Sequence, residues 1–308
     1  VRTQQKWMEV LADVGADRIR SRTSGASGRV EIRESETSLG VLIKVSGIID
    51  GNQLELPGAT FQIRDQQALR KYVQQLRDDG ASVALAEKKA FGLTSEQLVA
   101  LNESLALPLD LDTKNRPASE VVAFARSQLD YDLTLNAAAR RAIDRGEPFP
   151  DELRGLSVGT SLAAAVRPLG LVLVPLRRPG QAIVLRLVDE GDADEYWPVG
   201  WPATTVPNRT VPGLFEKYTL EIRDIALKQV LAAIEAKSGV PMLFDHKSLK
   251  QAGIDPAATK VTFVSNRASY GYGLRKVLSQ TEPRMTYQIR VDDAGRPFLW
   301  LSTASPAK

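Results

Sequence analysis

The chain has 308 residues, of which 43% are hydrophobic and 25% are charged, and its formal net charge is only +3. This length predicts two or three domains, and the near balance of basic and acidic side chains along the chain argues against a nucleic-acid surface. Cysteine is absent and His246 is the only histidine, which excludes disulfides, thiolate zinc sites and poly-histidine metal sites. The longest apolar runs, such as Leu171–Leu176, fall far short of the roughly 20 residues of a membrane span.

Residues 1–105 are expected to form an N-terminal α+β domain. Apolar residues at helical spacing predict a first helix around Trp7, and Asp65 is a plausible cap for a second helix that Gly80 would end. The strands expected in this domain are Arg18–Arg22, Val30–Arg33, Leu39–Ile49, one around Leu54–Leu56, and Val83–Ala86, with a hairpin loop at Ser24–Gly28. Phe61–Arg64 leads into the second helix. A helix that opens at Thr94 would lead into the next domain.

Residues 106–188 predict a first small module in which strands and helices alternate. Pro117 suits the first turn of a helix, Asn136 can cap a short helix, and Thr160 can cap the helix Ser161–Arg167. The expected strands are Leu107–Leu111, Leu133–Leu135, Leu153–Val158, and a closing hairpin of Leu171–Leu176 with Ala182–Val188.

Residues 215–303 predict a second module with the same order of elements, and Glu216–Thr303 is the clearest stretch of the chain. The expected strands are Tyr218–Ile222, Met242–Phe244, Lys260–Val264, and a hairpin of Met285–Val291 with Arg296–Ser302. The expected helices are Asp224–Ser238, His246–Ala252 and Ser269–Thr281. Apolar positions of the two modules register at offsets that grow slowly from 110 to 115, for example Val121 with Leu231, so we expect a tandem duplication.

Residues 189–214 separate the two modules as a linker rich in proline and tryptophan. Because proline fixes φ and removes a hydrogen-bond donor, this segment should be extended and irregular. Trp197 and Trp201 are costly to leave in water, so they are expected either to clamp the linker onto a neighbouring domain or to form a binding surface. Tyr272, flanked by glycines in the second module, is a further candidate for binding.

The second module resembles the short N-terminal domain shared by secretins and TonB-dependent receptors. The cues are a strand followed by the helix sequence DIALKQVLAAIEAKSGVPMLFD, in which Ile225 and Leu227 open the helix, and a second helix followed by a two-stranded hairpin. The first module resembles it more weakly, and residues 1–308 are not expected to include a secretin pore region or a receptor barrel. In its weak tandem repeats and its Trp-Pro-Val-Gly-Trp-Pro and GRPFLWLS segments, the chain is similar to uncharacterised secreted proteins of planctomycete-type bacteria.

This resemblance implies an α+β fold of two tandem βαβ–βαβ-type modules after the N-terminal domain. It also implies a non-catalytic bacterial envelope protein, periplasmic or secreted, that binds a protein partner or assembles without a cofactor. Small modules with open sheets suit such binding because their edge strands offer unpaired backbone groups. The alternative is an enzyme or small-ligand protein with a site between the modules, and nucleic-acid binding is the third hypothesis.

Asp245 and His246 are the candidates for that alternative site, because an adjacent acid and histidine at a strand end could form a catalytic dyad. They also fit a simpler role, in which Asp245 caps the short helix and His246 lies on its first turn. The acidic run from Asp189 to Glu195 could bind calcium, although its spacing does not match the Asp-x-Asp-x-Asp-Gly loop. Asp292–Gly295 reads as a hairpin turn, and Ser157–Ser161 as a strand-to-helix turn without the Gly-Lys-Ser/Thr ending of a phosphate loop.

Overall fold

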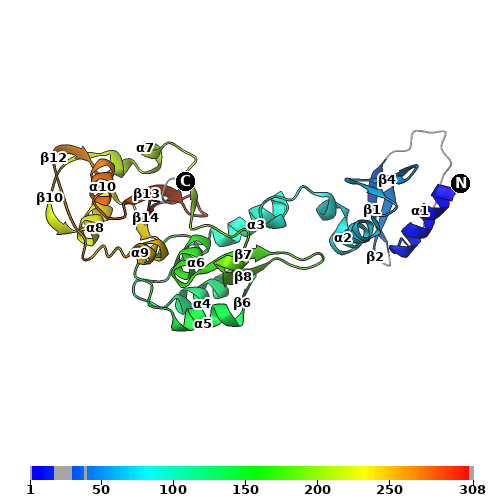
Figure 1. Cartoon of the computed structure of the whole chain (residues 1–308), viewed down its shortest axis with the longest axis horizontal. Coiled ribbons are helices and arrows are strands. Elements are labelled where there is room, and N and C mark those ends of the chain that lie inside the picture. The colour runs from blue at the N-terminus through cyan, green and yellow to red at the C-terminus, as the bar shows by residue number, and fades with distance from the viewer. Residues whose placement is uncertain (1, 17–29, 38–39, 305–308) are drawn as a thin grey trace. The chain divides into compact units, whose positions relative to one another are not determined.

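The structure, a computed structural model, describes residues 2–16, 30–37 and 40–304 and has the expected α+β class (Figure 1). The chain divides into two compact units. Unit 1 comprises Val1–Ser95 with Arg177–Ala182, and unit 2 comprises Glu96–Leu176 with Ile183–Lys308. Within the described ranges, no helix is long and apolar enough to cross a membrane.

Unit 1 packs two helices with short antiparallel strands. Its elements are α1 (Arg2–Asp13), β1 (Glu31–Thr37), β2 (Gly40–Ser46), β3 (Ile48–Asp50), β4 (Gln53–Leu56), β5 (Ala59–Gln62), α2 (Gln66–Leu85) and the 3-10 turn Ala90–Gly92. Strands β1 and β2 pair with each other, and β3, β4 and β5 form a second sheet in that order. The core includes Trp7, Leu54 and Leu69, none of which is more than 2% exposed. Arg18–Arg22 and Ser24–Gly28 lie outside the described residues.

Several expectations for unit 1 are wrong. Asp65 precedes α2, but its side chain accepts from the N–H of Gln62 and does not cap the helix. The strand expected over Leu39–Ile49 breaks at Gly47, where a Cβ would lie 2.6 Å from the carbonyl oxygen of Glu55. The strand expected over Val83–Ala86 is instead helical through Leu85. Gly80 interrupts α2 with a φ of +76°, but Glu34 accepts a hydrogen bond from the backbone N–H of Ala81 and so caps the turns that follow.

The first module of unit 2 follows α3 (Ser95–Leu105), whose Leu101 and Leu105 are buried. Its elements are α4 (Ala118–Gln128), β6 (Asp132–Leu135), α5 (Ala137–Arg145), α6 (Val158–Val166), β7 (Leu171–Leu176) and β8 (Val184–Asp189), with 3-10 turns at Arg167–Leu169 and Glu190–Asp192. Asn136 caps α5, as expected, by accepting from the N–H of Ala139 at 2.7 Å. All nine residues of α6 are buried.

The strands expected over Leu107–Leu111 and Leu153–Val158 do not form. The two segments run antiparallel but share a single bridge, between Pro108 and Ser157. The ladder does not extend, because the N–H of Leu156 bonds to the carbonyl oxygen of Leu153 and α6 begins at Val158. The cap expected at Thr160 is also wrong: α6 begins at Val158, and Ser157 is its cap.

The second module of unit 2 has two separate sheets. Its elements are β9 (Trp201–Pro202), α7 (Pro207–Thr210), the 3-10 turn Pro212–Phe215, β10 (Lys217–Ala226), α8 (Leu227–Ser238), β11 (Met242–Phe244), α9 (His246–Ala252), β12 (Lys260–Ser269), α10 (Tyr270–Leu278), β13 (Met285–Val291) and β14 (Pro297–Thr303). Helix α8 begins later than expected, because Asp224 has a φ of +51°. Helix α10 packs against α8 and contacts both β12 and β13, so it lies between the two sheets (Figure 1).

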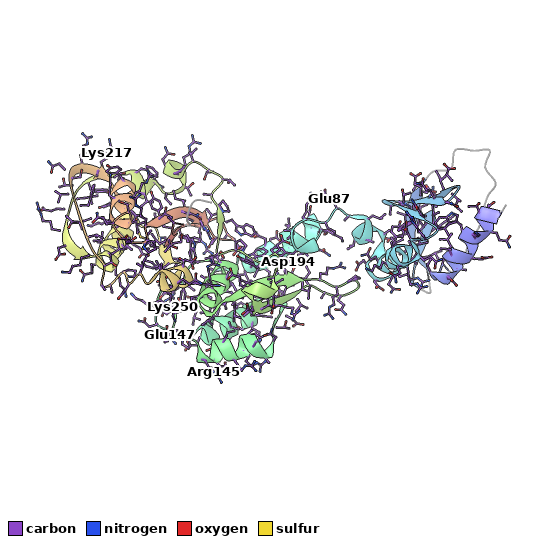
Figure 2. The ribbon with its side chains drawn as sticks, in the orientation of Figure 1. Glu87, Arg145, Glu147, Asp194, Lys217 and Lys250 are labelled. Atoms are coloured by element: carbon purple, nitrogen blue, oxygen red, sulfur yellow. The ribbon has the colours of Figure 1, made fainter. Side chains whose placement is uncertain are left out.

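The three-stranded parts of the two modules have the same strand order. In the first module, β8 lies between β6 and β7, parallel to β6 and antiparallel to β7. In the second module, β14 lies between β11 and β13, parallel to β11 and antiparallel to β13. The surface carries many charged side chains, such as Glu147 and Lys250, which face each other at 4.0 Å (Figure 2). Both are more than three-quarters exposed, so this pair contributes little to stability.

Candidate functional site

Strand β13 has one open edge. On one side it pairs with β14 along its whole length, from Met285 to Val291. On the other side only Arg290 and Val291 pair, with the two-residue strand β9. In the part of the chain that the structure describes, residues 285–289 therefore have no strand partner on this side, and the edge can accept another strand.

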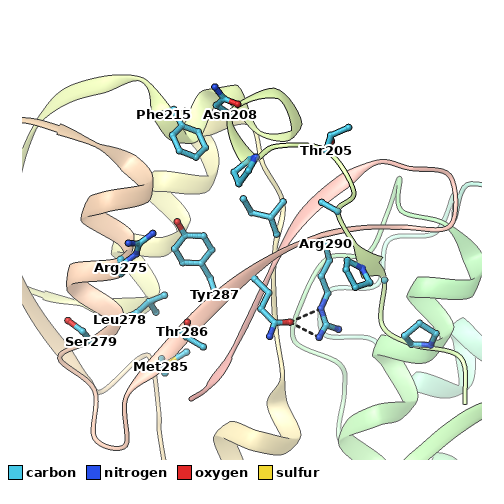
Figure 3. Close-up of a pocket in the computed structure, with 17 residues that line it drawn as sticks. Thr205, Asn208, Phe215, Arg275, Leu278, Ser279, Met285, Thr286, Tyr287 and Arg290 are labelled. Carbon is cyan, nitrogen blue, oxygen red and sulfur yellow. Dashed lines mark hydrogen bonds between the residues drawn. The ribbon is translucent and has the colours of Figure 1, made fainter. Parts of the chain in front are cut away.

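A groove of about 1240 Å³ follows this open edge (Figure 3). All six consecutive residues from Met285 to Arg290 line it. Because successive side chains of a strand point to opposite faces of the sheet, a surface lined by every residue in turn must run along the edge of the strand. The opposite walls come from α10 (Arg275, Leu278, Ser279), from Phe215, and from the segment 198–208.

The far wall of the groove contains three prolines, one of which lies where the pairing of β9 with β13 ends. Pro198, Pro202 and Pro207 all line the groove, and Pro202 is the last residue of β9. A proline has no N–H to donate to a ladder, so β9 stops after two residues and the segment leaves the strand. The protein's own linker thus covers the end of the β13 edge and leaves the rest open.

The two tryptophans of the same segment hold this wall in place. Trp197 and Trp201 each donate their indole N–H to Oδ1 of Asp293, both at 2.9 Å, and their rings meet edge to face. Trp197 is only 3% exposed, and Trp201 is half-buried. Neither indole lines the groove; Pro198 and Pro202, the residues that follow each of them, do.

Asp293 also joins the second module to the first. Its Oδ2 accepts hydrogen bonds from Ser157 Oγ at 2.7 Å, from Thr160 N at 2.8 Å and from Thr160 Oγ1 at 3.0 Å. These donors lie at the N-terminus of α6, where free N–H groups and the helix dipole favour a negative charge. The carboxylate therefore approaches Gly159 closely, and a Cβ there would lie 2.6 Å from Oδ2.

The turn expected over Asp292–Gly295 is present, and its first residue strengthens the same junction. The Oδ1 atom of Asp292 accepts from the N–H groups of Ala294 and Arg296 within the turn. Its Oδ2 accepts from the N–H of Ser157 at 2.8 Å and from Nε of Arg296 at 2.9 Å. Both acids of this turn are buried, at 1% and 8% exposed, with their oxygens hydrogen-bonded.

The groove is positively charged. Arg275 and Arg290 line it, whereas its lining contains no aspartate or glutamate. Arg290 is held in place by a bond from Nη1 to the carbonyl oxygen of Val199 and by two bonds to Oε1 of Gln288 (Figure 3). Burial, and then repulsion by Arg167, lower the pKa of Arg290 from its usual value, against the opposing attraction of Asp245. Among the described residues, no carboxylate forms an ion pair with Arg275 or Arg290.

The remaining binding candidate, Tyr272, lies on α10 but does not line the groove. It is 48% exposed. Phe263 of β12 meets its ring edge to face at 6.0 Å between centroids, and Lys276 Nζ lies 5.4 Å from the ring centroid.

Asp245 and His246 lie at a second contact between the two modules. Asp245 caps α9 through the N–H of Ser248, as expected, and both of its oxygens accept from Arg167 at 3.1 Å. The Nε2 atom of His246 lies 2.8 Å from Oδ2 of Asp151, which also accepts from the N–H of Phe244. The structure thus brings each of these two residues against a different residue of the first module.

The acidic run that precedes Trp197 is partly used in the same contact. Glu190 pairs with Lys247 and lies 3.7 Å from Arg167, while Tyr196 donates to it at 3.3 Å. The hydrogen bond from Lys247 lowers the pKa of Glu190, against the opposing effect of burial, and Arg167 lowers it further. Glu190 is therefore held as a carboxylate between two cations of the junction.

Searches against models of protein families, curated proteins and solved structures each returned no match. The function of this site therefore has to be inferred from the residues of this chain alone. No pattern in the sequence predicts the open edge at residues 285–289 or the contacts of Asp293. The repeated prolines of the linker are the one available signal, since they show that this segment cannot itself complete a sheet.

Proposed function

We propose that the chain is a non-enzymatic interaction module that binds an extended segment of a protein partner along the open edge of β13. The observation that carries this proposal is the groove lined by every residue from Met285 to Arg290. Main-chain hydrogen bonds to an edge strand supply affinity in this mode of recognition, and alternate side chains of the added strand supply specificity.

The size and chemistry of the groove fit a peptide strand. Small-ligand pockets typically occupy about 300–1,000 Å³ and are enclosed by mainly apolar residues. This groove is larger, at about 1240 Å³, and it follows a strand whose neighbouring side chains alternate between exposed Thr286 and Gln288 and partly buried Tyr287 and Ile289. An added strand would lie beside β13 at the usual spacing of about 4.8 Å.

The alternative, an enzyme or ligand site near Asp245 and His246, has weaker support. The carboxylate of Asp245 accepts hydrogen bonds from Arg167 and from the first turn of its own helix, and the ring of His246 is hydrogen-bonded to Asp151. These contacts suit a structural junction. We therefore place the binding function at β13 and assign these two residues to the contact between the modules.

We also propose that the two modules arose by duplication and that the protein acts in the bacterial envelope. The equal strand orders of the two modules support the duplication. The location rests on the resemblance to secretin and receptor domains, and fractionation of cells that make the full-length gene product tests it.

A selection of displayed peptides tests the binding function. A library of random peptides of about ten residues, the upper range of strand length, is panned against the whole chain. The enriched peptides are then measured by fluorescence anisotropy against the parent protein and against Thr286→Trp, which places an indole in the groove. We expect Thr286→Trp to abolish binding, whereas Val264→Trp, at an exposed strand position outside the groove, should bind as the parent does.

The proposal is wrong if no enriched peptide distinguishes Thr286→Trp from Val264→Trp. Thermal unfolding of both variants serves as the control for folding, since both replace an exposed strand side chain.

A further inference from the structure

From the charges in the groove, we propose that its partner is an acidic strand, with a glutamate or aspartate side chain that pairs with Arg290. This inference rests on the proposed function, because it specifies the chemistry of the segment that adds to β13.

The first reason to expect an acidic partner is the guanidinium of Arg290. It has five N–H donors, of which Gln288 accepts two and the carbonyl oxygen of Val199 accepts one. The group also lies over the ring of Trp300, 5.4 Å from the centroid. It is thus a fixed, partly buried cation with N–H groups remaining, which suits a carboxylate because a planar guanidinium matches carboxylate geometry.

The position of Arg290 along the strand is the second reason. It is the first residue of β13 that pairs with β9, and residues 285–289 before it have no partner on that side, so it marks the end of the open edge. A strand added beside residues 285–289 would end next to this guanidinium. A carboxylate at that end of the strand would therefore lie within reach of Arg290 without distorting the ladder.

The charge balance of the whole lining is the third reason. Arg275, exposed on α10, adds a second positive charge to the groove, and the lining contains no aspartate or glutamate. Asp245, which lies outside the lining, attracts Arg290 but is itself bound to Arg167. An acidic peptide would be attracted to this surface and a basic one repelled. This preference should weaken as salt is added, since exposed charges are screened over about 10 Å at 0.1 M ionic strength.

The test uses the groove-dependent peptides obtained by selection. Each acidic residue of such a peptide is replaced in turn by its amide, Glu by Gln or Asp by Asn, and binding is measured to the parent protein and to Arg290→Gln. We expect one replacement to weaken binding to the parent roughly tenfold, the effect typical of a charge-assisted hydrogen bond. The same replacement should have no effect on binding to Arg290→Gln, which a double-mutant cycle would show as coupling between the two groups.

Two further variants keep the inference testable if Arg290→Gln disturbs the wall at Val199. Arg290→Lys retains the charge but not the planar guanidinium, so it should keep only part of the preference for the acidic peptide, the part that weakens as salt is added. Arg275→Gln, an exposed change on a helix, should reduce the preference by a smaller factor.

The outcomes separate the two proposals. Groove-dependent peptides without an excess of acidic residues, or with acidic residues whose replacement costs no affinity, would overturn the acidic partner and leave the function of the groove in place. If no peptide depends on the groove, the proposed function is wrong, and the acidic partner fails with it.

Discussion

Trp197 donates its indole N–H to Asp293 at 2.9 Å, across 96 positions of the sequence. This bond links the linker to the turn between β13 and β14, and the same carboxylate binds the N-terminus of α6. One buried acid thus connects the wall of the groove with one of the two contacts between the modules.

Asp293→Asn should lower the free energy of unfolding by about 2–4 kcal/mol, because the amide would turn an N–H₂ group toward donors that now face an oxygen. Urea denaturation of the whole chain measures this loss. Asp194→Asn, at an exposed position of the linker, is the matched control and should change stability little. Equal stability of the two variants would show that Asp293 does not hold the junction.

Gly159→Ala should destabilise the protein by roughly 1–3 kcal/mol, since the added methyl group would meet Asp293 Oδ2 at 2.6 Å and Leu105 Cβ at 2.9 Å. The control is Gly191→Ala, where the nearest atom to an added Cβ lies at 3.4 Å. Thermal unfolding compares the two. Similar unfolding temperatures would contradict the close approach of the carboxylate to α6.

Arg167→Met should cost about 3 kcal/mol, because it leaves the buried carboxylate of Asp245 without its guanidinium. Arg223→Met removes an exposed pair with Glu221 and should cost well under 1 kcal/mol. Adding Asp245→Asn to Arg167→Met should recover part of the loss, since asparagine still caps a helix. No recovery would mean that the unpaired charge is not the cause.

Glu235→Gln should stabilise the protein at neutral pH. Burial raises the pKa of Glu235 above its usual 4.5, and the nearby charge of Asp151 raises it further. The hydrogen bond from the N–H of Met242 acts in the opposite direction but does not cancel these effects. A carboxyl whose pKa is raised on folding costs stability above its folded pKa, and the cost disappears as the pH falls through that value. Glutamine keeps the acceptor for Met242 without the charge.

The measurement is the unfolding free energy of the parent and of Glu235→Gln from pH 7 to pH 4. The two curves should converge as the pH falls, whereas the exposed control Glu221→Gln should show no such convergence. A constant difference across this range would contradict the role of the buried charge.

Local patterns predict much of unit 2. Asn136 and Asp245 cap their helices as expected, because a cap depends on residues three positions away. The closing hairpins also follow from alternation and turn residues. The failures come from tertiary contacts, such as the capping of Ala81 by Glu34, 47 positions earlier in the chain, which allows a helix where a strand is expected.

The groove itself depends on contacts that no local pattern contains. The tandem modules and the proline-rich linker can be recognised in the sequence, but the pairing of Trp201 with Val291 cannot. That pairing decides where the linker leaves β13 and hence which part of the edge stays open. The binding role expected for Trp197 and Trp201 thus becomes, in our proposal, a role in building the wall beside the site.

Amide hydrogen exchange of the whole chain, with and without a groove-dependent peptide, tests the central claim most directly. If the peptide adds as a strand, amides in Met285–Ile289 that do not already pair with β14 should become protected, while the exposed pair β10 and β12 should exchange as before. Protection confined to β10 and β12, or to the surface around Tyr272, would contradict binding at the β13 edge.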